Sequence, residues 1–425
     1  MNIMVIGSGG REHAIGLALS QSPRVPQLFF LPGNPGTARL GINIECDVMD
    51  RSGIVACAKS LGIDMVLVGP EGPLVAGLAD ELVAAGIPTI GPGREAAQLE
   101  GSKAWAKAKM KAYGIPTAAY DVYTDYASAL TRVQQGPFPL VIKADGLASG
   151  KGVVVAQDEA EAVAAIEAML VGHVFAEAGS RVVIESFLKG EEASVFACCD
   201  GETMVILGGA QDHKRIGEGD TGPNTGGMGA YSPAPVLTPD VMARVQSQVF
   251  EPLLRGFKAD GIRYVGVVFA GLMIDEGAVS VVEFNVRLGD PETQVILDRL
   301  DTDWVALCEA MVAGRLSEVG VEWRDGASVC VVLAAPGYPG KVETGQRLEG
   351  SWESEWVMHA GTRQGRGDEV VVSGGRVLGV MGEGADLGEA VGRAYERVGQ
   401  VGFEGMQYRR DIGRRGLVHL GLVDE

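Results

Sequence analysis

Short apolar runs alternate with helical patterns along the N-terminal part of the chain. The apolar runs, each of the length of a buried strand, lie at 3–6, 28–31, 65–68 and 88–90. The segments with helical periodicity lie between them, at 12–19, 51–61 and 75–85. Such alternation is typical of βαβ units around a parallel sheet. We therefore expect an N-terminal α/β domain over residues 1–101.

After residue 101 the pattern changes to strands connected by longer segments. Predicted strands lie at 137–156, as two arms around a glycine-rich turn, and at 181–185, 193–199, 264–274 and 279–286. Predicted helices lie at 103–113, 158–170, 291–300 and 304–313, and Asp158 caps the second of them. The segment 211–235 has no periodicity, and its length favours a functional loop.

The C-terminal part is again rich in predicted strands, at 329–334, 370–372 and 377–380, with a last helix at 387–398. A chain of 425 residues is too long for one ordinary core. We predict three domains, over 1–101, 102–325 and 326–425, with a small lid subdomain at about 120–190 in the second. The first is α/β, and the other two are α+β.

Composition and charge narrow the class of protein. Hydrophobic residues make up 46% and charged residues 21% of the chain, which is the balance of a globular protein. The longest uncharged apolar run, 265–274, is well short of the ~18 residues that span a bilayer. The N-terminus also lacks the pattern of a signal peptide. We expect a cytoplasmic protein without a membrane partner.

Charge and cysteine content exclude two further classes. The chain has 36 basic and 55 acidic residues, and its net charge of −19 opposes binding of nucleic acid. Its six cysteines have no CxxC spacing, which indicates buried thiols rather than disulfides or a zinc site. An anionic small molecule would need a locally positive pocket.

Glycine-rich turns follow the first two predicted strands. GSGGREH, residues 7–13, lacks the third glycine of a dinucleotide fingerprint because Glu12 stands there. Its glycines and the helix N-terminus still favour a phosphate or carboxylate, and a merely tight strand-to-helix turn is the weaker alternative. PGNPGTA, residues 32–38, would lie at the same sheet edge, and alone it is also ordinary turn chemistry.

A second glycine-rich stretch, IKADGLASGKGVVVA at 142–156, lies between two strands. Its spacing does not fit a P-loop, and Gly152 stands where Ser or Thr is needed. The stretch therefore predicts a hairpin flap whose amides and Lys151 fold over phosphates. Lys143, at the end of the incoming strand, lies on the face opposite Leu140 and Ile142 and needs an anionic partner. The alternative is a hairpin with solvated lysines.

The segment VVEFNVRLGDPET, residues 281–293, alternates polar and apolar side chains. Period two places Val282, Phe284 and Val286 toward the core, and the polar side chains Glu283, Asn285 and Arg287 on the other face. A carboxylate and an amide two residues apart suit the oxygen preference of Mg²⁺, and arginine adds an anion clamp. An alternating polar face that is merely solvated is the competing interpretation.

Two other segments carry weaker signals. VIESFLKGEEAS, residues 183–194, ends a strand in a linker that offers backbone groups to an adenine and carboxylates to ribose hydroxyls. QDHKR and GPNTGGMGAYSP place anion-binding side chains and flexible backbone in the segment 211–235. No GxSxG or HExxH motif occurs. What remains are the groups used in phosphoryl transfer.

Ten motifs in order resemble one family over essentially the whole chain. They are GSGGREHA, GPEGPL, QLEGSKA, KADGLASGKGV, GEEAS, QDHKR, TGPNTGGMGAYSP, EFNVRLGDPETQ, HAGT and YRRDIG. The chain is similar in these to the phosphoribosylamine–glycine ligase family of the ATP-grasp superfamily. The resemblance implies a parallel-sheet domain, an ATP-grasp domain of two subdomains that hold ATP between them, and a small strand-rich C-terminal domain.

The resemblance also implies a reaction, in which ATP, glycine and 5-phosphoribosylamine give glycinamide ribonucleotide, ADP and phosphate by way of glycyl phosphate. This is the second step of de novo purine synthesis. The implied cofactors are ATP and Mg²⁺ or Mn²⁺, and we expect a monomer. Rival interpretations are an ATP-grasp ligase with another carboxylate or amine, a nucleotide-binding module without catalysis and, least of all, a dinucleotide oxidoreductase.

Site residues follow from the same resemblance. The nucleotide would be bound by Lys103, Lys143, Gly146, Ser149, Gly150, Lys151, Gly152, Glu185, Ser186, Phe187, Leu188 and Glu192. The substrates would be bound by Gly9, Gly10, Asn34, Asp212, Lys214, Gly226, Gly227 and Arg287. The metal would be held by Glu283 and Asn285. The resemblance gives catalytic roles to Lys143, Asp212 and Arg287.

One position departs from the wider superfamily. Many ATP-grasp enzymes carry a third metal carboxylate on the strand before EFN, where this chain has Ala270. The expected metal site therefore rests on Glu283, Asn285 and ATP.

Overall fold

The computed structural model describes residues 1–24, 26–147, 152–172 and 180–424. Its N-terminal part is a five-stranded parallel sheet in the order β3-β2-β1-β4-β5. The strands are β1 Asn2–Gly7, β2 Gln27–Pro32, β3 Ile42–Asn43, β4 Met65–Val68 and β5 Thr89–Ile90. The helices are α1 Gly10–Ser20, α2 Arg51–Ser60, α3 Glu71–Ala76, α4 Leu78–Ala84 and α5 Arg94–Gly101. The predicted parallel sheet is confirmed.

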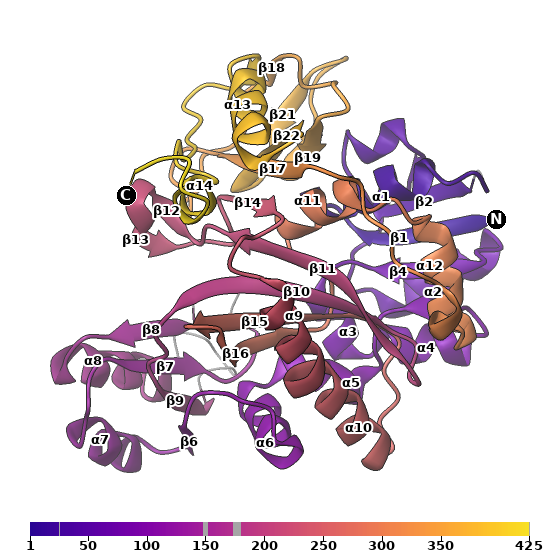
Figure 1. The fold of residues 1–425 in the computed structure, drawn as a ribbon. Helices are drawn as coiled ribbons and strands as arrows, with labels where there is room; N and C mark the ends of the chain where they lie inside the picture. The colour runs from indigo at the N-terminus through magenta and orange to yellow at the C-terminus, as the bar shows by residue number, and fades with distance from the viewer. Residues whose placement is uncertain (25, 148–151, 173–179, 425) are drawn as a thin grey trace.

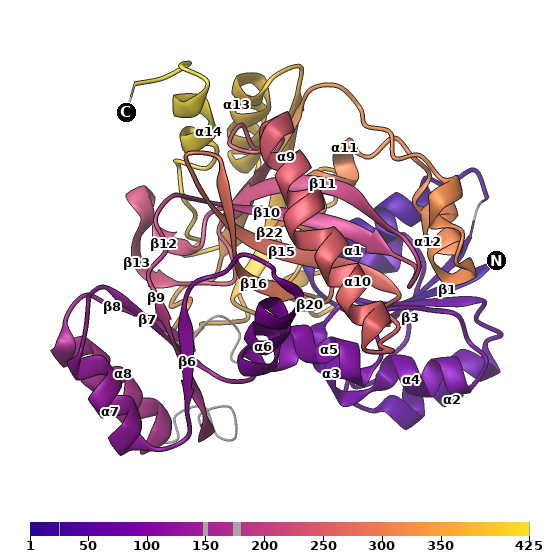
Figure 2. The same ribbon diagram turned by 60° about the horizontal axis from the view of Figure 1, so that its bottom comes forward.

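A four-stranded antiparallel sheet forms a separate small body, seen at the lower left of Figures 1 and 2. Its strands, in spatial order, are β6 Tyr120–Tyr123, β9 Val182–Ser186, β7 Leu140–Ala144 and β8 Val153–Ala156. Helices α7 Tyr126–Gln134 and α8 Glu159–Leu170 cover one face and share a core with it. As predicted, the Asp158 carboxylate caps α8 by accepting from the Glu161 amide at 2.9 Å.

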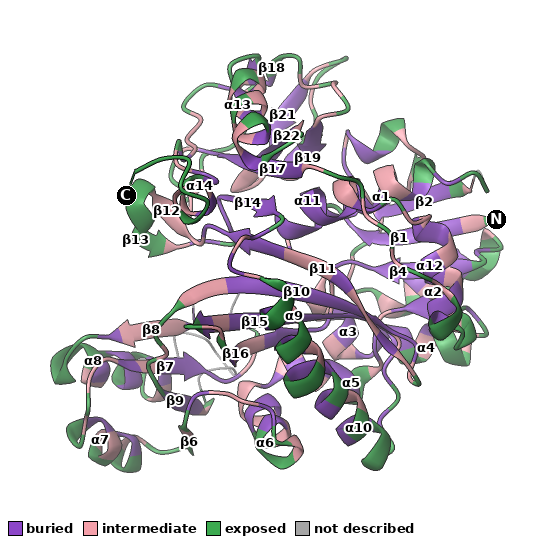
Figure 3. Ribbon diagram, viewed as in Figure 1, coloured by how far each residue is buried: buried purple, intermediate pink, exposed green. Residues whose placement is uncertain are grey.

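The largest sheet has eight strands in the order β16-β15-β10-β11-β14-β17-β22-β19. Its strands are β10 Glu191–Cys199, β11 Met204–Asp212, β14 Gly229–Ser232, β15 Gly266–Asp275, β16 Ala278–Asn285, β17 Ala327–Ala334, β19 Val357–His359 and β22 Arg376–Gly384. Because β14 pairs antiparallel with β17, the sheet continues across the boundary predicted near residue 325. Figure 3 shows most of these strands buried.

Seven further helices pack around this sheet and its edges. They are α6 Lys103–Tyr113, α9 Pro239–Val245, α10 Glu251–Ala259, α11 Glu292–Arg299, α12 Trp304–Ala313, α13 Leu387–Val398 and α14 Arg414–His419. Three two-stranded sheets and four short 3-10 or π-helical segments, at Thr37–Arg39, Glu218–Asp220, Gln246–Phe250 and Leu316–Glu318, are also present in the described residues. The sheets comprise β12 Arg215–Gly217 with β13 Thr221–Asn224, β18 Glu349–Gly350 with β23 Val401–Gly402, and β20 Thr362–Gln364 with β21 Val370–Val372.

Three predicted elements are wrong in detail. The helix expected at 75–85 is divided into α3 and α4 because Gly77 adopts a left-handed conformation with φ 96°. The segment 211–235 contains the end of β11 and three more strands, of which β12 and β13 pair with each other, while β14 pairs with β11 and with the distant β17. Helix α13 is followed by α14.

All six cysteines are free thiols, as predicted; Cys198, Cys199, Cys308 and Cys330 are buried, whereas Cys46 and Cys57 are only partly buried, so for these two the expected burial is wrong. No helix in the described ranges has the length and apolarity needed to cross a bilayer.

Candidate active site

A cleft of about 820 Å³ lies between the small antiparallel sheet, the large sheet and the helices α5 and α6. Most of the predicted site residues line it although they are far apart in sequence. These are Lys103, Lys143, Gly146, Gly152, Glu185, Ser186, Phe187, Leu188, Glu192, Asp212, Lys214, Gly226, Glu283, Asn285 and Arg287. The predicted flap residues Ser149, Gly150 and Lys151 lie outside the described residues.

Three lysines meet at one end of the cleft. Lys143, on β7, lies with its Nζ 3.0 Å from Glu185 Oε1, and Lys107 Nζ lies 2.8 Å from Oε2 of the same carboxylate. The side chains of Lys143, Lys107 and Glu185 are almost fully buried. Lys103 donates to the Gly146 carbonyl at 2.9 Å, at the start of the predicted flap. The resulting cluster carries more positive than negative charge, which suits a polyphosphate.

Burial lowers the pKa of two of these lysines, Lys107 and Lys103. Burial lowers the pKa of Lys107 to about 8, against the attraction of Glu185. The pKa of Lys103 is likewise lowered, chiefly by burial, while Glu283 acts in the opposite direction. An incoming anion stabilises such desolvated ammonium groups strongly, because a phosphate replaces the stabilisation that water would otherwise give to their charge.

A β-bulge in β16 shapes the floor of the cleft. The register between β15 and β16 shifts between Gly271 and Leu272, so that Val281 pairs with Leu272 and Glu283 pairs with Gly271. The prediction that Val282 faces the core is therefore wrong, because a bulge reverses the alternation, and Val282 lines the cleft. Phe284 and Val286 do lie in the core. The Val282 carbonyl, which the bulge frees, accepts from Lys143 Nζ at 3.1 Å.

Glu283 and Asn285 lie side by side on β16 and line the cleft. Burial opposes ionisation of Glu283, but Lys214, Lys143 and Lys103 lower its pKa below the usual value. A charged carboxylate beside an amide oxygen suits a hard cation whose other ligands are phosphate oxygens. Among the described residues, no three His, Cys, Asp or Glu side chains are grouped as a metal site.

Arg287 is already engaged in the structure. Its Nη2 lies 2.7 Å from Glu100 Oε1 and 3.2 Å from Asn285 Oδ1, and its Nε lies 3.3 Å from Glu71 Oε2. Burial raises the pKa of Glu100 to about 7, although Arg287 opposes the rise. Two carboxylates thus hold the guanidinium in a fixed orientation, and a substrate anion would have to compete with them.

Asp212 and Glu292 belong to another part of the cleft lining, in which acidic and basic side chains are mixed. Burial raises the pKa of Asp212 at the end of β11, while Lys214 acts against the rise. Burial also raises the pKa of Glu292, which accepts from Ser194 Oγ at 3.2 Å. Lys214 forms a short ion pair with Glu192. Arg415 also acts on Asp212 and Arg287 on Glu292, so carboxyl groups and cations alternate here, and a carboxyl oxygen can accept from the ammonium group of an amino acid.

The side chain of Glu12, in the first turn of α1, fills the space beside the loop that precedes this helix. Glu12 is buried, and its carboxylate accepts from the Gly9 amide at 2.6 Å and from Arg11 Nε at 2.7 Å. The residue that breaks the dinucleotide fingerprint therefore occupies the space under the turn. A Cβ at Gly69 would lie 1.9 Å from the Glu12 carboxylate, which accounts for that glycine.

Asn34 connects two parts of the protein instead of facing the cleft. Its Nδ2 donates to the Ser8 carbonyl and to the His359 carbonyl, each at 2.9 Å. The His359 amide donates to His13 Nδ1 at 2.8 Å. Asn34 is buried, so the structure places it as a link between the N-terminal loops and β19 rather than as an exposed ligand.

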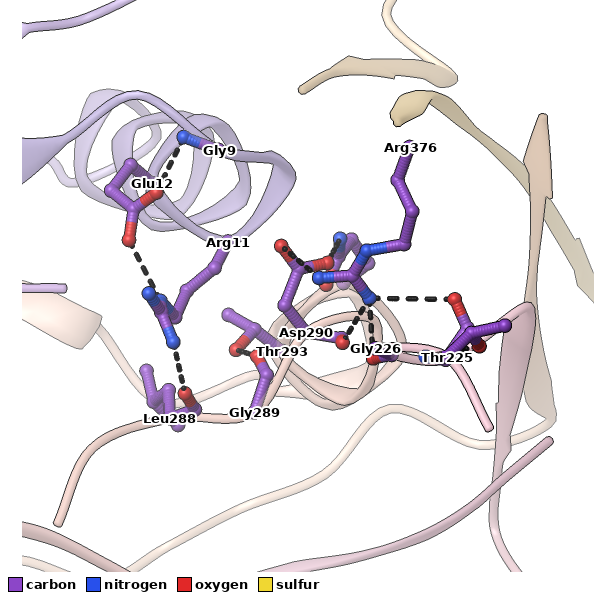
Figure 4. A network of polar contacts seen from close by, with 12 residues as sticks. Gly9, Arg11, Glu12, Thr225, Gly226, Leu288, Gly289, Asp290, Thr293 and Arg376 are labelled. Atoms are coloured by element: carbon purple, nitrogen blue, oxygen red, sulfur yellow. Dashed lines mark hydrogen bonds and ion pairs between the residues drawn. The ribbon is translucent and has the colours of Figure 1, made fainter. Parts of the chain in front are cut away.

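Gly10 and Gly227 both lie close to Asp290, which Figure 4 shows beside Gly226 and Arg376. A Cβ on Gly10 would lie 3.5 Å from Asp290 Oδ1, and one on Gly227 would lie 3.4 Å from the Asp290 carbonyl. Arg376, from β22, forms an ion pair with Asp290 at 3.4 Å. The loops expected to bind substrate therefore converge on one junction.

Sequence reasoning missed several residues at this cleft. Lys107 has a local signal, because it lies one helical turn after Lys103 and so on the same face of α6. Glu71 and Glu100 belong to GPEGPL and QLEGSKA, and Glu292 to EFNVRLGDPETQ, but their roles depend on side chains from other elements. Arg376 has no local signal.

Comparison with known proteins agrees with this geometry. Residues 1–100, 101–293 and 328–415 match the N domain, the ATP-grasp (A) domain and the C domain of phosphoribosylglycinamide synthetase. The chain belongs to the phosphoribosylglycinamide synthetase family. Two relatives, from Vibrio vulnificus and Mesorhizobium japonicum, are phosphoribosylamine–glycine ligases that are 50% and 48% identical to it. The alignments cover 98% and 97% of this chain, and 99% and 98% of the relatives.

Solved structures confirm the fold of this phosphoribosylglycinamide synthetase family member. A phosphoribosylamine–glycine ligase of Thermotoga maritima superposes with a TM-score of 0.86 at 36% identity, over 97% of this chain and 100% of that one. A biotin carboxylase of Campylobacter jejuni is only 14% identical but superposes with a TM-score of 0.71, over 97% and 94% of the two chains. The second likeness concerns the fold alone.

Proposed function

We infer that this protein ligates glycine to 5-phosphoribosylamine at the expense of ATP, giving glycinamide ribonucleotide, ADP and phosphate. The observation that carries the inference is one cleft lined both by the lysines Lys103 and Lys143 and by the carboxyl groups of Asp212 and Glu292. A polyphosphate suits the lysines, and a carboxyl group can accept from the ammonium group of glycine. Membership of the family supports the same reaction.

The chemistry would run in two displacements. A carboxylate oxygen of glycine attacks the γ-phosphorus of ATP in line, the bond to the β-phosphate oxygen breaks, and glycyl phosphate and ADP result. The amine of phosphoribosylamine then attacks the glycyl carbonyl, loses a proton and expels phosphate. Because glycine is already an anion at its carboxylate, the first step needs no dedicated base.

Residues of the protein would orient the substrates and neutralise the charge of the ATP phosphates. Lys103 and Lys143 would bind the ATP phosphates, with the flap from Gly146 to Gly152 closing over them. Because Lys107 and Lys143 hold the Glu185 side chain, the linker 186–188 would bind the adenine. Losing one charged group that meets the transferring phosphoryl costs about 10²-fold or more in rate.

Ribose and glycine recognition follow from the remaining contacts. Glu192 would accept the ribose hydroxyls while it is also paired with Lys214. Asp212 would bind the glycine ammonium group, and Arg287 would meet the glycyl phosphate. The loops near Gly9, Gly10 and Asn34 would face phosphoribosylamine, and the Gly226–Gly227 turn would face glycine or its acyl phosphate.

Glu283 and Asn285 would hold Mg²⁺ or Mn²⁺, and the cation would neutralise charge on the phosphates when it is bound. The fit rests on an ionised carboxylate and an amide oxygen that line the same cleft as the lysines. We also propose that the protein works in the cytoplasm as a monomer, which size-exclusion chromatography tests.

The function is tested by measuring ADP and glycinamide ribonucleotide with each substrate omitted in turn. Both products should form only when ATP, glycine and phosphoribosylamine are all present, and alanine or serine should not replace glycine. Lys143→Ala should abolish turnover, whereas Lys111→Ala, an exposed lysine of the same helix as Lys103, should not. ADP release that is indifferent to glycine would refute the assignment.

A further inference from the structure

Arg376 belongs to the C-terminal part of the chain but reaches the cleft of the ATP-grasp domain. It stands at the beginning of β22, its side chain is 22% exposed, and it lines the cleft. Its Nη1 donates to the carbonyls of Gly226 and Asp290, both at 2.5 Å, and lies 3.4 Å from the Gly227 carbonyl. Its Nη2 lies 3.4 Å from Asp290 Oδ2. One guanidinium therefore binds two separate segments (Figure 4).

The Gly226–Gly227 turn, which Arg376 holds, is also fixed by other contacts. The Gly226 amide donates to Tyr338 Oη at 2.9 Å, which is a second contact with the C-terminal part. Gly227 has φ 114°, and a Cβ there would lie 2.5 Å from Pro291. The Gly227 amide donates to Thr225 Oγ1 at 2.9 Å. The C-terminal part thus fixes the Gly226–Gly227 turn from two sides.

Asp290 carries the connection on to the N-terminal domain. The Arg11 amide at the start of α1 donates to its carboxylate and, with Arg376, keeps the pKa of Asp290 low against the opposing effect of desolvation. Arg11 Nη1 donates to the Leu288 carbonyl at 3.0 Å. Arg376, Asp290 and the start of α1 therefore form a continuous chain of polar contacts across three segments that are distant in sequence.

This network is separate from the lysine cluster. The hydrogen bonds and ion pairs of Lys103, Lys107 and Lys143 involve Gly146, Glu185, Thr117 and the Val282 carbonyl, none of which contacts Arg376 among the described residues. A change at Arg376 should therefore alter the substrate end of the cleft and leave the phosphate end intact.

We propose that Arg376 is a positioning residue for the ligation reaction. It holds the Gly226–Gly227 turn and Asp290 so that the amine of phosphoribosylamine meets the carbonyl carbon of the glycyl group. The proposal rests on the proposed function. Arginine suits this role because its rigid planar fork of five donors can bind two carbonyls and a carboxylate in a fixed geometry, whereas glutamine has only two donors and the lysine ammonium is a compact charge on a flexible stem. A displacement of about 1 Å at such a turn costs on the order of 10²-fold in reaction rate.

The test compares steady-state kinetics of R376Q, Y338F and the wild type. R376Q should lower kcat/KM for glycine and for phosphoribosylamine by about 10- to 100-fold, while its KM for ATP stays within about twofold. Y338F removes only one hydroxyl and should shift the same parameters in the same direction by less. The dissociation constant for ATP, measured without the other substrates, should be unchanged in both variants.

Arg347 provides the matched control. It is an arginine of the same C-terminal part, paired with Glu369 at 3.3 Å on the surface and absent from the cleft lining. R347Q should behave as the wild type. Should R376Q prove unfolded by circular dichroism, Y338F decides the question alone.

Two results would overturn the proposal: unchanged kinetics in folded R376Q and Y338F, or an equal loss in affinity for all three substrates. A wild-type protein that makes no glycinamide ribonucleotide would instead contradict the proposed function, so the two failures are distinguishable.

Discussion

Lys107 and Lys143 share one buried carboxylate, with their Nζ atoms 2.8 and 3.0 Å from the two oxygens of Glu185. One carboxylate cannot neutralise two ammonium groups, so the trio leaves a net positive charge in a site from which water is largely excluded. Such a charge is costly on its own and is stabilised when an anion arrives. The arrangement makes Lys107, which reaches Glu185 from α6, part of the electrostatics of the cleft.

Lys107→Met should therefore weaken turnover although Lys107 lies behind Lys143. Without Lys107, Glu185 neutralises Lys143 alone, and the positive charge available to phosphate falls. We expect KM for ATP to rise and kcat to fall by about 10²-fold. Steady-state kinetics of the purified variant measure both parameters.

Lys111→Met is the control, because Lys111 is exposed on the same helix. It should leave both parameters within about twofold of the wild type. A Lys107→Met protein with wild-type kinetics would show that Glu185 and Lys143 do not depend on the second lysine.

Glu283→Gln should change the requirement for divalent cation. The substitution keeps the side-chain volume but removes the charge that the surrounding lysines maintain. Activity should be lost at the Mg²⁺ concentration that saturates the wild type and should recover in part at higher concentrations. Titrating activity with Mg²⁺ and with Mn²⁺ measures the shift.

Glu276→Gln, in the exposed turn between β15 and β16, should titrate with the cation like the wild type. EDTA should abolish the activity of all three proteins. Identical midpoints for Glu283→Gln and the wild type would remove Glu283 from the metal site.

The paired histidines at the junction of α1 and β19 should make stability depend on pH. Burial lowers the pKa of His13 to about 3, with His359 adding to the effect, and lowers that of His359 to about 4. Both folded-state values lie below the unfolded value near 6.5. The unfolded chain therefore binds protons first, and the contribution of each histidine to stability is lost as pH falls below 6.5.

The expected loss is about 2 kcal/mol for each histidine between pH 7 and pH 5. Urea denaturation of the wild type and of His13→Gln at both pH values isolates one contribution, since carboxylates titrate in both proteins. The free energy of unfolding of the wild type should fall by about 2 kcal/mol more than that of the variant. Parallel changes in the two proteins would mean that His13 is not held neutral.

Gly69→Ala should destabilise the N-terminal domain. A Cβ there would lie 1.9 Å from the buried Glu12 carboxylate, which is also bound to Gly9 and Arg11. Overpacking of this kind costs about 1–3 kcal/mol. Gly320→Ala, where a Cβ meets nothing within 4 Å, should be neutral or slightly stabilising. Equal thermal midpoints for the two variants would contradict the close packing at Glu12.

The sequence predicts the fold and the cleft well where local pattern and long-range structure agree. Alternating strands and helices predict the parallel sheet, and the glycine-rich stretch after Lys143 predicts the hairpin of β7 and β8. The bulge that turns Val282 into the cleft is invisible in the alternation of β16 alone, because it arises from pairing with β15. In the segment 211–235, β14 is missed for the same reason, because it pairs with the distant β17.

Side-chain partners are predicted less well than positions. Lys143 needs an anionic partner by its burial on a strand, but only the fold shows that Glu185 supplies it and that Lys107 shares it. Asn34 illustrates the opposite case, in which a residue expected at the substrate end is a buried link to β19. Arg376 could not be predicted, because its partners are backbone carbonyls of a distant turn.

Transfer of oxygen from glycine to phosphate tests the central claim most directly. Glycine labelled with heavy oxygen in its carboxylate is incubated with the enzyme, ATP and phosphoribosylamine, and the inorganic phosphate is analysed by mass spectrometry. If the glycine carboxylate is phosphorylated and phosphate is then expelled by the amine, each phosphate carries one labelled oxygen. Phosphate without label, formed together with glycinamide ribonucleotide, would contradict the account.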